Sequence, residues 1–297
     1  MTDSESVRRS PPLPGLDGAR HRDVEVDGVR LHVAEVGPDS GRPVLLVHGW
    51  PQHWWCWRKV VEMLPGCRCV MPDLRGHGWS DAPESGYEKR QLAADMRNLL
   101  DALEIERVTY VGHDWGAVTG FILATESPER IAALVALSVP HPWPSFHDRL
   151  SPRRLAAGLY QVPLSTPVLS RTLLRAGIVK RVLVAGDGGS TFTPEEAEVY
   201  NATLASDDGA RATVALYRTF LLRELPAVLM GLQDQALQVR TRLIVGDRDP
   251  IVRGADLHGF EAHAADMEVE WVPGAGHFLP EERPELIAER IREILPG

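Results

Sequence analysis

The spacing of apolar and polar positions changes twice along this chain. Residues 23–37 alternate apolar and polar side chains around Asp27-Gly28, which predicts a β-hairpin. After the hairpin, short apolar runs alternate with helix-spaced patterns up to residue 140. Strands are predicted at 43–50, 67–78, 108–114 and 131–140, and helices at 53–65, 89–105 and 115–127. This alternation is typical of an α/β fold with a parallel sheet and helices on both faces.

The strand pattern stops at Pro140 and returns about 100 residues later. The intervening segment predicts helices, each with a Ser, Thr or Asp near its start, at 151–161, 194–206 and 209–225. Strands at 241–250 and 267–278 and a closing helix at 284–295 complete the pattern. We therefore expect a flexible N-terminal tail at 1–20, an α/β core at 21–140 and 225–297, and an inserted helical lid at 141–224.

Composition narrows the class of protein. Hydrophobic residues make up 44% and charged residues 25%, as in ordinary globular proteins. The net charge of -9, without a run of Lys or Arg, argues against nucleic acid or an anionic membrane as partner. Cys56, Cys67 and Cys69 are too few for a disulfide framework, and no Cys or His cluster completes a metal site. Without an apolar signal core or a run long enough to span a bilayer, we expect a cytoplasmic, reducing location and no membrane insertion. The sequence does not determine the oligomeric state, and a homodimer is one of the possibilities.

Three candidate catalytic residues each follow a predicted strand: Asp114, Asp249 and His277. The carboxyl ends of parallel strands are where such sheets bind ligands. Asp114 is flanked by Gly112 and Gly116, the spacing of a nucleophile elbow, whose central residue is usually Ser. Asp114 could instead merely cap the helix that follows it. The order nucleophile, acid, histidine along the chain favours a catalytic triad.

Five segments carry a resemblance to a known family: 48–57, 73–81, 112–116, 246–250 and 274–284. They are similar to the corresponding segments of α/β-hydrolases, and within that family of the epoxide hydrolases. The resemblance implies an α/β-hydrolase fold with a mostly parallel central sheet and a helical lid. It implies a covalent ester on Asp114, hydrolysed by water that His277 activates, with Asp249 orienting the imidazole. No metal and no organic cofactor is implied.

The loop around residues 48–51 is expected to complete the site. Backbone N–H groups of Trp50 and Trp115 would form the oxyanion hole. Trp50-Pro51 is a candidate cis peptide bond, although X–Pro bonds are trans on base rates. His48 and Pro51, together with His141 at the lid hinge, are expected to contact substrate. Segment 73–81 is interpreted as a glycine-rich structural loop, which gives His77 no catalytic role.

The leaving group decides between two reactions. An opened epoxide leaves an alkoxide that needs a proton, and epoxide hydrolases supply it from two lid tyrosines. Tyr217 resembles the second of these. Alignment on Gln161 places the first at Ala156, one helical turn before Tyr160 on the same face. Tyr160 either takes over that role or is a packing residue.

Other lid groups could also supply the proton, namely Tyr200, His141 and His147. We expect a small apolar epoxide and water as substrates and a vicinal diol as product. The alternative is a haloalkane dehalogenase with the same nucleophile, which would use the indole of Trp115 but often carries Asn where this chain has Trp50. A third hypothesis, motivated by the mismatch between Tyr160 and the expected position of the first tyrosine, is a ligand-binding protein without activity.

Overall fold

The hairpin predicted around Asp27-Gly28 opens the fold. The computed structural model describes residues 11–143, 158–186, 191–230, 235–252 and 257–296. In it, β1 (Arg20–Val26) pairs antiparallel with β2 (Val29–Val36). Asp27 and Gly28 have positive φ angles of 49° and 75°, which a two-residue hairpin turn requires.

Eight strands of the described residues form one sheet in the order β1-β2-β4-β3-β5-β6-β7-β8. The strands after the hairpin are β3 (Arg42–Val47), β4 (Cys67–Pro72), β5 (Val108–His113), β6 (Ile131–Leu137), β7 (Thr241–Gly246) and β8 (Met267–Val272). The β2 strand is antiparallel to β1 and β4, whereas the pairs from β4 through β8 are parallel. The predicted mostly parallel sheet is confirmed.

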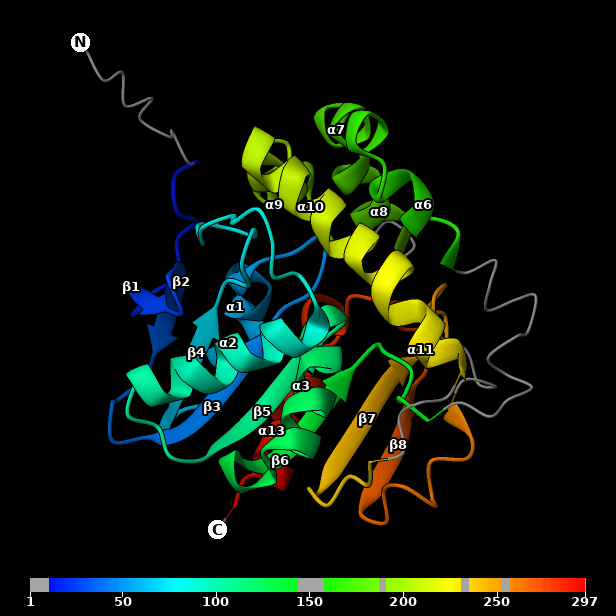
Figure 1. Ribbon diagram of the computed structural model, residues 1–297. Helices are drawn as coiled ribbons and strands as arrows, with labels where there is room; N and C mark the ends of the chain where they lie inside the picture. Colours follow the sequence, from blue (N-terminus) through cyan, green and yellow to red (C-terminus); the bar gives the residue numbers. More distant parts are fainter. Residues whose placement is uncertain (1–10, 144–157, 187–190, 231–234, 253–256, 297) are drawn as a thin grey trace.

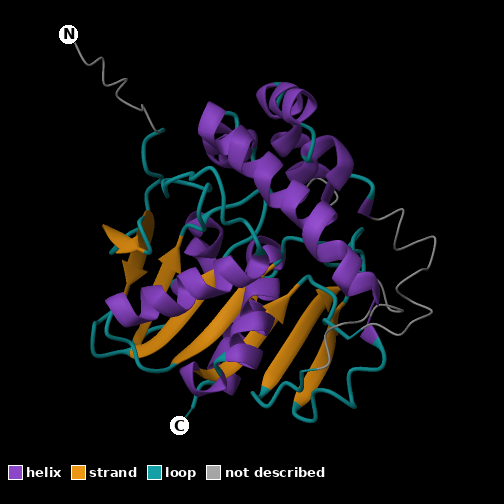
Figure 2. Ribbon diagram, viewed as in Figure 1, coloured by secondary structure: helices purple, strands orange, loops and turns teal. Residues whose placement is uncertain are grey.

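Helices cover both faces of the sheet, as predicted (Figures 1 and 2). On one face lie α2 (Lys89–Ala102) and α3 (Trp115–Glu126), and on the other α1 (Arg58–Val61) and α13 (Pro284–Ile294). Shorter helical turns are η1 (Trp54–Trp57), η2 (Pro128–Arg130) and α12 (Leu279–Glu282). The helix predicted at 53–65 is therefore shorter than expected and begins as a 3₁₀ turn, which buries Trp54 and Trp57.

The segment between β6 and β7 forms a helical lid over the carboxyl ends of the strands (Figure 1). Its helices are α6 (Gln161–Leu164), α7 (Pro167–Arg175), α8 (Ile178–Gly186), α9 (Pro194–Leu204), α10 (Asp207–Thr219), the π-helical turn η3 (Phe220–Glu224) and α11 (Leu225–Met230). Helix α9 starts at a capping box between Thr193 and Glu196, and Ser206 caps α10.

Two lid expectations differ from the structure, and a third lies mostly beyond what the structure describes. Helices α7 and α8 were not expected; both are amphipathic and nine residues long. The lid helices continue past residue 224 because η3 leads directly into α11, which ends at Met230. Most of the helix predicted at 151–161 lies outside the described residues.

The N-terminal segment is attached to the core over its described part. The indole N–H of Trp79 donates to the Pro11 carbonyl at 2.7 Å, and that of Trp55 donates to the Gly15 carbonyl at 3.0 Å. Leu16 packs on the core. The flexible tail expected at 1–20 is therefore too long. Pro11, Gly15 and Leu16 contact the core, and β1 already begins at Arg20.

No helix among the described residues has the length and apolar character needed to cross a bilayer. Nor do their His, Cys, Asp and Glu side chains form a group of three or more that could hold a metal ion.

Candidate active site

Asp114 lies at the sharp turn between β5 and α3. Its φ of 51° and ψ of -119° are strained for a residue with a side chain, which typically costs about 1–3 kcal/mol. Close packing holds the turn: a Cβ added to Gly112 would lie 2.5 Å from the Gly116 carbonyl oxygen, and one added to Gly116 would lie 2.1 Å from the Val47 carbonyl oxygen. The Asp114 side chain makes no capping hydrogen bond to α3, a helix whose residues are all described. Helix capping therefore does not explain why this residue is an aspartate.

The Asp114 carboxylate instead receives backbone N–H groups from two sides. The Trp50 N–H donates to Oδ2 at 2.9 Å, and the Trp115 N–H also hydrogen-bonds to the carboxylate. A Cβ on Gly49 would lie 2.4 Å from Oδ2, so the loop approaches this closely because residue 49 has no side chain. The Trp50–Pro51 peptide bond is cis. Burial raises the pKa of Asp114 to about 6, although His277 and the two N–H groups oppose the rise.

His277 and Asp249 meet at the ends of β8 and β7. The His277 Nδ1 lies 2.8 Å from Asp249 Oδ2, and both side chains are buried. Asp249 Oδ1 accepts the N–H groups of Ile251 and Val252 at 2.7 and 3.1 Å, which fixes the carboxylate. Burial lowers the pKa of His277, but Asp249, and to a smaller extent Asp114, outweigh this and raise it to about 9.

Two lid tyrosines meet beside the carboxylate. Tyr160 directly precedes α6, and Tyr217 lies on α10. Their rings meet edge to face with centroids 6.0 Å apart, and their hydroxyl groups are hydrogen-bonded. The Tyr217 ring also packs edge-on against Trp50 and Trp115, at 5.6 and 5.9 Å. Burial is the main cause that raises the pKa of both tyrosines, and the charge of nearby Asp114 adds to it.

A cavity of about 410 Å³ lies between the lid and the sheet. Asp114, His277 and Tyr160 supply the polar groups of its wall. The other lining residues are apolar, from core and lid: Trp50, Pro51, Pro163, Leu164, Leu173, Ile178, Val182, Pro250, Ile251 and Phe278. A buried carboxylate, an imidazole held by a second carboxylate, and a phenol thus face one apolar space.

Known proteins share this architecture over most of their length. The alpha/beta hydrolase fold family matches residues 42–161. Epoxide hydrolase 3 of Siraitia grosvenorii is 32% identical over 321 residues, which cover 94% of this chain and 99% of that protein. The chain belongs to the epoxide hydrolase family of α/β-hydrolases. The crystal structure of epoxide hydrolase VrEH1 from Vigna radiata is 30% identical, with a TM-score of 0.79 over 94% of this chain and 98% of that one. The soluble epoxide hydrolase of Corynebacterium sp. is 26% identical over 91% of this chain and 94% of that protein.

Two residues expected to bind substrate do not line the cavity. The buried His48 ring accepts the Leu74 N–H at Nε2 (3.0 Å), and its Nδ1 lies 3.1 Å from the Gly49 carbonyl, so it braces the loop. Burial lowers the pKa of His48 to about 3. His141 Nε2 bonds to the His258 carbonyl at 3.2 Å, which holds the hinge. Pro51 does line the cavity.

The other candidate proton donors also lie elsewhere or outside the described residues. The Tyr200 hydroxyl donates to Glu281 Oε1 at 2.6 Å and accepts from Arg58 at 3.4 Å, so it belongs to a buried ion-pair network between lid and core. His147 lies outside the described residues, as does Ala156. Among the described tyrosines, the pair at 160 and 217 is thus the one beside Asp114.

Sequence reasoning missed Glu282. Its carboxylate accepts the N–H of Gly276 at 2.6 Å and the N–H of Phe278 at 2.8 Å, the two residues on either side of His277. This clamp fixes the backbone that carries the imidazole. The available signal was an acidic residue in the helical turn directly after the histidine, inside a segment that resembles the family.

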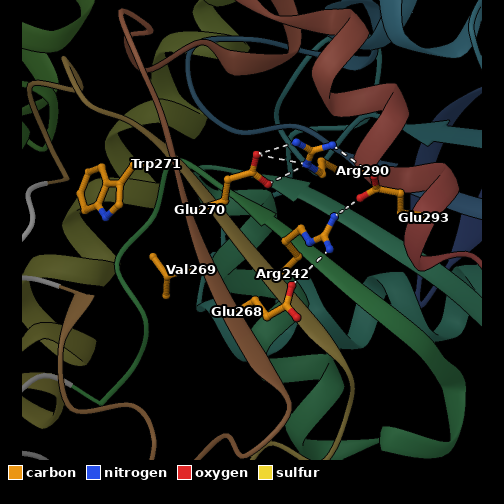
Figure 3. A pocket seen from close by; sticks show the side chains of 7 residues that line it. All are labelled: Arg242, Glu268, Val269, Glu270, Trp271, Arg290 and Glu293. Atoms are coloured by element: carbon orange, nitrogen blue, oxygen red, sulfur yellow. Dashed lines mark hydrogen bonds and ion pairs between the residues drawn. The ribbon is translucent and has the colours of Figure 1, made fainter.

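A second hollow lies on the surface at β8 and α13 (Figure 3). Its charged side chains are already paired: Arg290 Nε lies 2.8 Å from Glu270, and Arg242 bonds to Glu268 and Glu293. It shares no lining residue with the apolar cavity beside Asp114. We therefore assign this hollow to a surface ion-pair network rather than to the candidate active site.

Proposed function

We propose that this protein hydrolyses small apolar epoxides to vicinal diols through a covalent ester on Asp114. The observation that carries the proposal is the pair of hydrogen-bonded tyrosines beside a carboxylate nucleophile. A carboxylate suits displacement at saturated carbon, and the resulting alkoxide needs the proton that a phenol supplies. The family of the chain supports the same reaction, because its relatives carry the name epoxide hydrolase.

In the first step, Asp114 Oδ1 attacks a ring carbon and the ring C–O bond breaks. Oδ2 stays with the Trp50 N–H and becomes the ester carbonyl oxygen. The oxygen of the opened ring takes a proton from Tyr160 or Tyr217, which leaves a tyrosinate. Tyr160 lines the cavity, whereas Tyr217 is buried behind it, so we assign direct contact with the epoxide oxygen to Tyr160.

In the second step, His277 removes a proton from water, and the hydroxide attacks Cγ of Asp114. The oxyanion forms on Oδ2, where the N–H groups of Trp50 and Trp115 stabilise it. Collapse of this intermediate releases the diol oxygen, which takes the proton from His277. The proton left on Asp114 returns the tyrosinate to a phenol, so water and epoxide balance the diol.

Esterification itself tunes His277 for this second step. The charge of Asp114 is one of the causes that raise the pKa of His277 to about 9. The ester carries no charge, so this contribution disappears while the intermediate exists. The imidazole is then more readily neutral, which is the form that accepts a proton from water.

A haloalkane dehalogenase with the same nucleophile is the alternative. The indole of Trp115 could bind the halide in such an enzyme. A departing halide needs no proton, however, so the two phenols beside the nucleophile would have no catalytic role. Assaying diol formation from styrene oxide and halide release from 1-bromobutane separates the two reactions. We expect diol without halide release, and loss of the diol in Asp114→Ala. Halide release together with inert epoxides would overturn the proposal.

A further inference from the structure

A buried lysine lies at the junction of the core and the lid, close to the nucleophile. Lys89 is the first residue of α2 and is 3% exposed. Its Nζ donates to Glu224 Oε2 at 3.0 Å, to the Leu216 carbonyl at 3.2 Å and to the Tyr87 carbonyl at 3.3 Å. Three acceptors match the three N–H donors of an ammonium group. Burial lowers the pKa of Lys89, and the neighbouring Glu224 carboxylate opposes this.

Two of these acceptors belong to the lid segment that carries Tyr217. Leu216 directly precedes Tyr217 on α10, and Glu224 ends the π-helical turn η3 that follows. Glu224 Oε1 also accepts the backbone N–H of Lys89 at 2.7 Å. Lys89 therefore holds the lid on both sides of Tyr217. Short π-helical turns are frequent at functional sites.

The same ammonium group contacts the aromatic residue beside the nucleophile. Its Nζ lies 4.5 Å from the ring centroid of Trp115, within range of a cation–π contact. Tyr217 also packs against Trp115, and its ring meets the indole edge-on at 5.9 Å. Tyr217 is thus bounded by a backbone that Lys89 holds and by an indole that Lys89 contacts.

We propose that Lys89 is a positioning residue that keeps the Tyr217 hydroxyl in place for ring opening. The proposal rests on the function proposed above. Lys89 is not among the residues that line the cavity, so it acts through Tyr217 and takes no direct part in ester hydrolysis. Displacement of a catalytic group by about 1 Å can cost roughly 100-fold in rate.

A double-mutant cycle with Lys89→Met and Tyr217→Phe tests this. Rapid quench and intact mass under single-turnover conditions give the rates of ester formation and ester hydrolysis separately. We expect Lys89→Met to slow ester formation roughly 5- to 10-fold, no more than Tyr217→Phe does, and to leave hydrolysis within about two-fold. In the Tyr217→Phe background, Lys89→Met should slow ester formation no further. Independent, multiplicative effects, or equal slowing of both steps, would overturn the proposal.

Two further variants keep the result interpretable. Lys89→Met/Glu224→Gln removes both charges and keeps an amide oxygen for the residue 89 N–H, so it carries the same expectation if the single variant does not fold. Arg223→Met breaks the exposed bridge to Glu88 at the same junction and should change neither rate. Wild-type protein that forms no ester overturns both proposals, whereas a normal ester with an independent Lys89 effect overturns this one alone.

Discussion

Tyr160 and Tyr217 come from different parts of the lid, yet their rings meet edge to face at 6.0 Å and their hydroxyl groups share a hydrogen bond beside Asp114. A proton can therefore move from either phenol toward the cavity, because the two hydroxyl groups are hydrogen-bonded to each other. In the proposed mechanism, a proton donor is needed when the ring opens and not when the ester is hydrolysed, so changes to the tyrosines should affect only the first step.

Removing the hydroxyls should slow ring opening selectively. We expect Tyr160→Phe and Tyr217→Phe each to slow ester formation roughly 10-fold, with the larger effect at Tyr160, which lines the cavity. The double variant should lose roughly 10²–10⁴-fold. Hydrolysis of a preformed ester, followed by intact mass after rapid quench, should be unchanged. A double variant that opens the ring at the wild-type rate would remove both tyrosines from the mechanism.

Glu282 should act on the second step. Its carboxylate holds the N–H groups on both sides of His277, so Glu282→Gln should loosen the imidazole and slow ester hydrolysis roughly 10-fold while ester formation stays within two-fold. The ester should accumulate, as it should more completely in His277→Gln. Glu285→Gln, at an exposed position in the same region, is the matched control. Equal slowing of both steps would point to a general loss of structure instead.

The two steps should respond differently to pH. Asp114 must be ionised to attack, and its pKa is raised to about 6, so ester formation should fall as the pH drops through about 6. His277 must be neutral to activate water. Its pKa is about 9 while Asp114 is charged and should be lower in the ester, so hydrolysis should rise with pH along a limb below 9. Rapid-quench rates across pH 5 to 10, a range set by these values, check both limbs. A hydrolysis rate that is flat over this range would contradict the role of His277.

The nucleophile turn should tolerate no side chain at residue 116. A Cβ there would lie 2.1 Å from the Val47 carbonyl oxygen, so Gly116→Ala should destabilise the protein by about 1–3 kcal/mol or displace Asp114. Gly158→Ala is the matched control, because that helical glycine has nothing within 4 Å of an added Cβ. Urea unfolding monitored by tryptophan fluorescence measures both. Equal stability of the two variants would mean that the turn is not packed as described.

The sequence predicted the sheet, and the strand ends at which the candidate triad lies, because both leave local signals. Short apolar runs mark buried strands, and Asp114, Asp249 and His277 each follow such a run directly. Glycines at 112 and 116 mark the turn because their close contacts exclude a Cβ. These features depend on neighbours in the chain, so periodicity and spacing reveal them.

The lid and the hinge were harder to predict because their roles depend on distant partners. Whether Tyr160 faces Asp114 or packs elsewhere depends on how α6 sits against α10, which residue spacing does not encode. His48 and His141 carry functional-looking side chains in the right segments, yet backbone groups far along the chain, Leu74 and His258, bind their rings instead. In the sequence, Lys89 is an ordinary first residue of a helix. Its contacts with the lid depend on the tertiary structure.

One measurement tests the covalent mechanism most directly. Excess enzyme reacts once with an epoxide in water enriched in ¹⁸O. Mass spectrometry then measures the ¹⁸O content of the diol and of the peptide that contains Asp114. Attack by the carboxylate predicts an unlabelled first-turnover diol and one ¹⁸O atom in Asp114. A labelled diol with an unlabelled Asp114 would mean that water opens the ring directly.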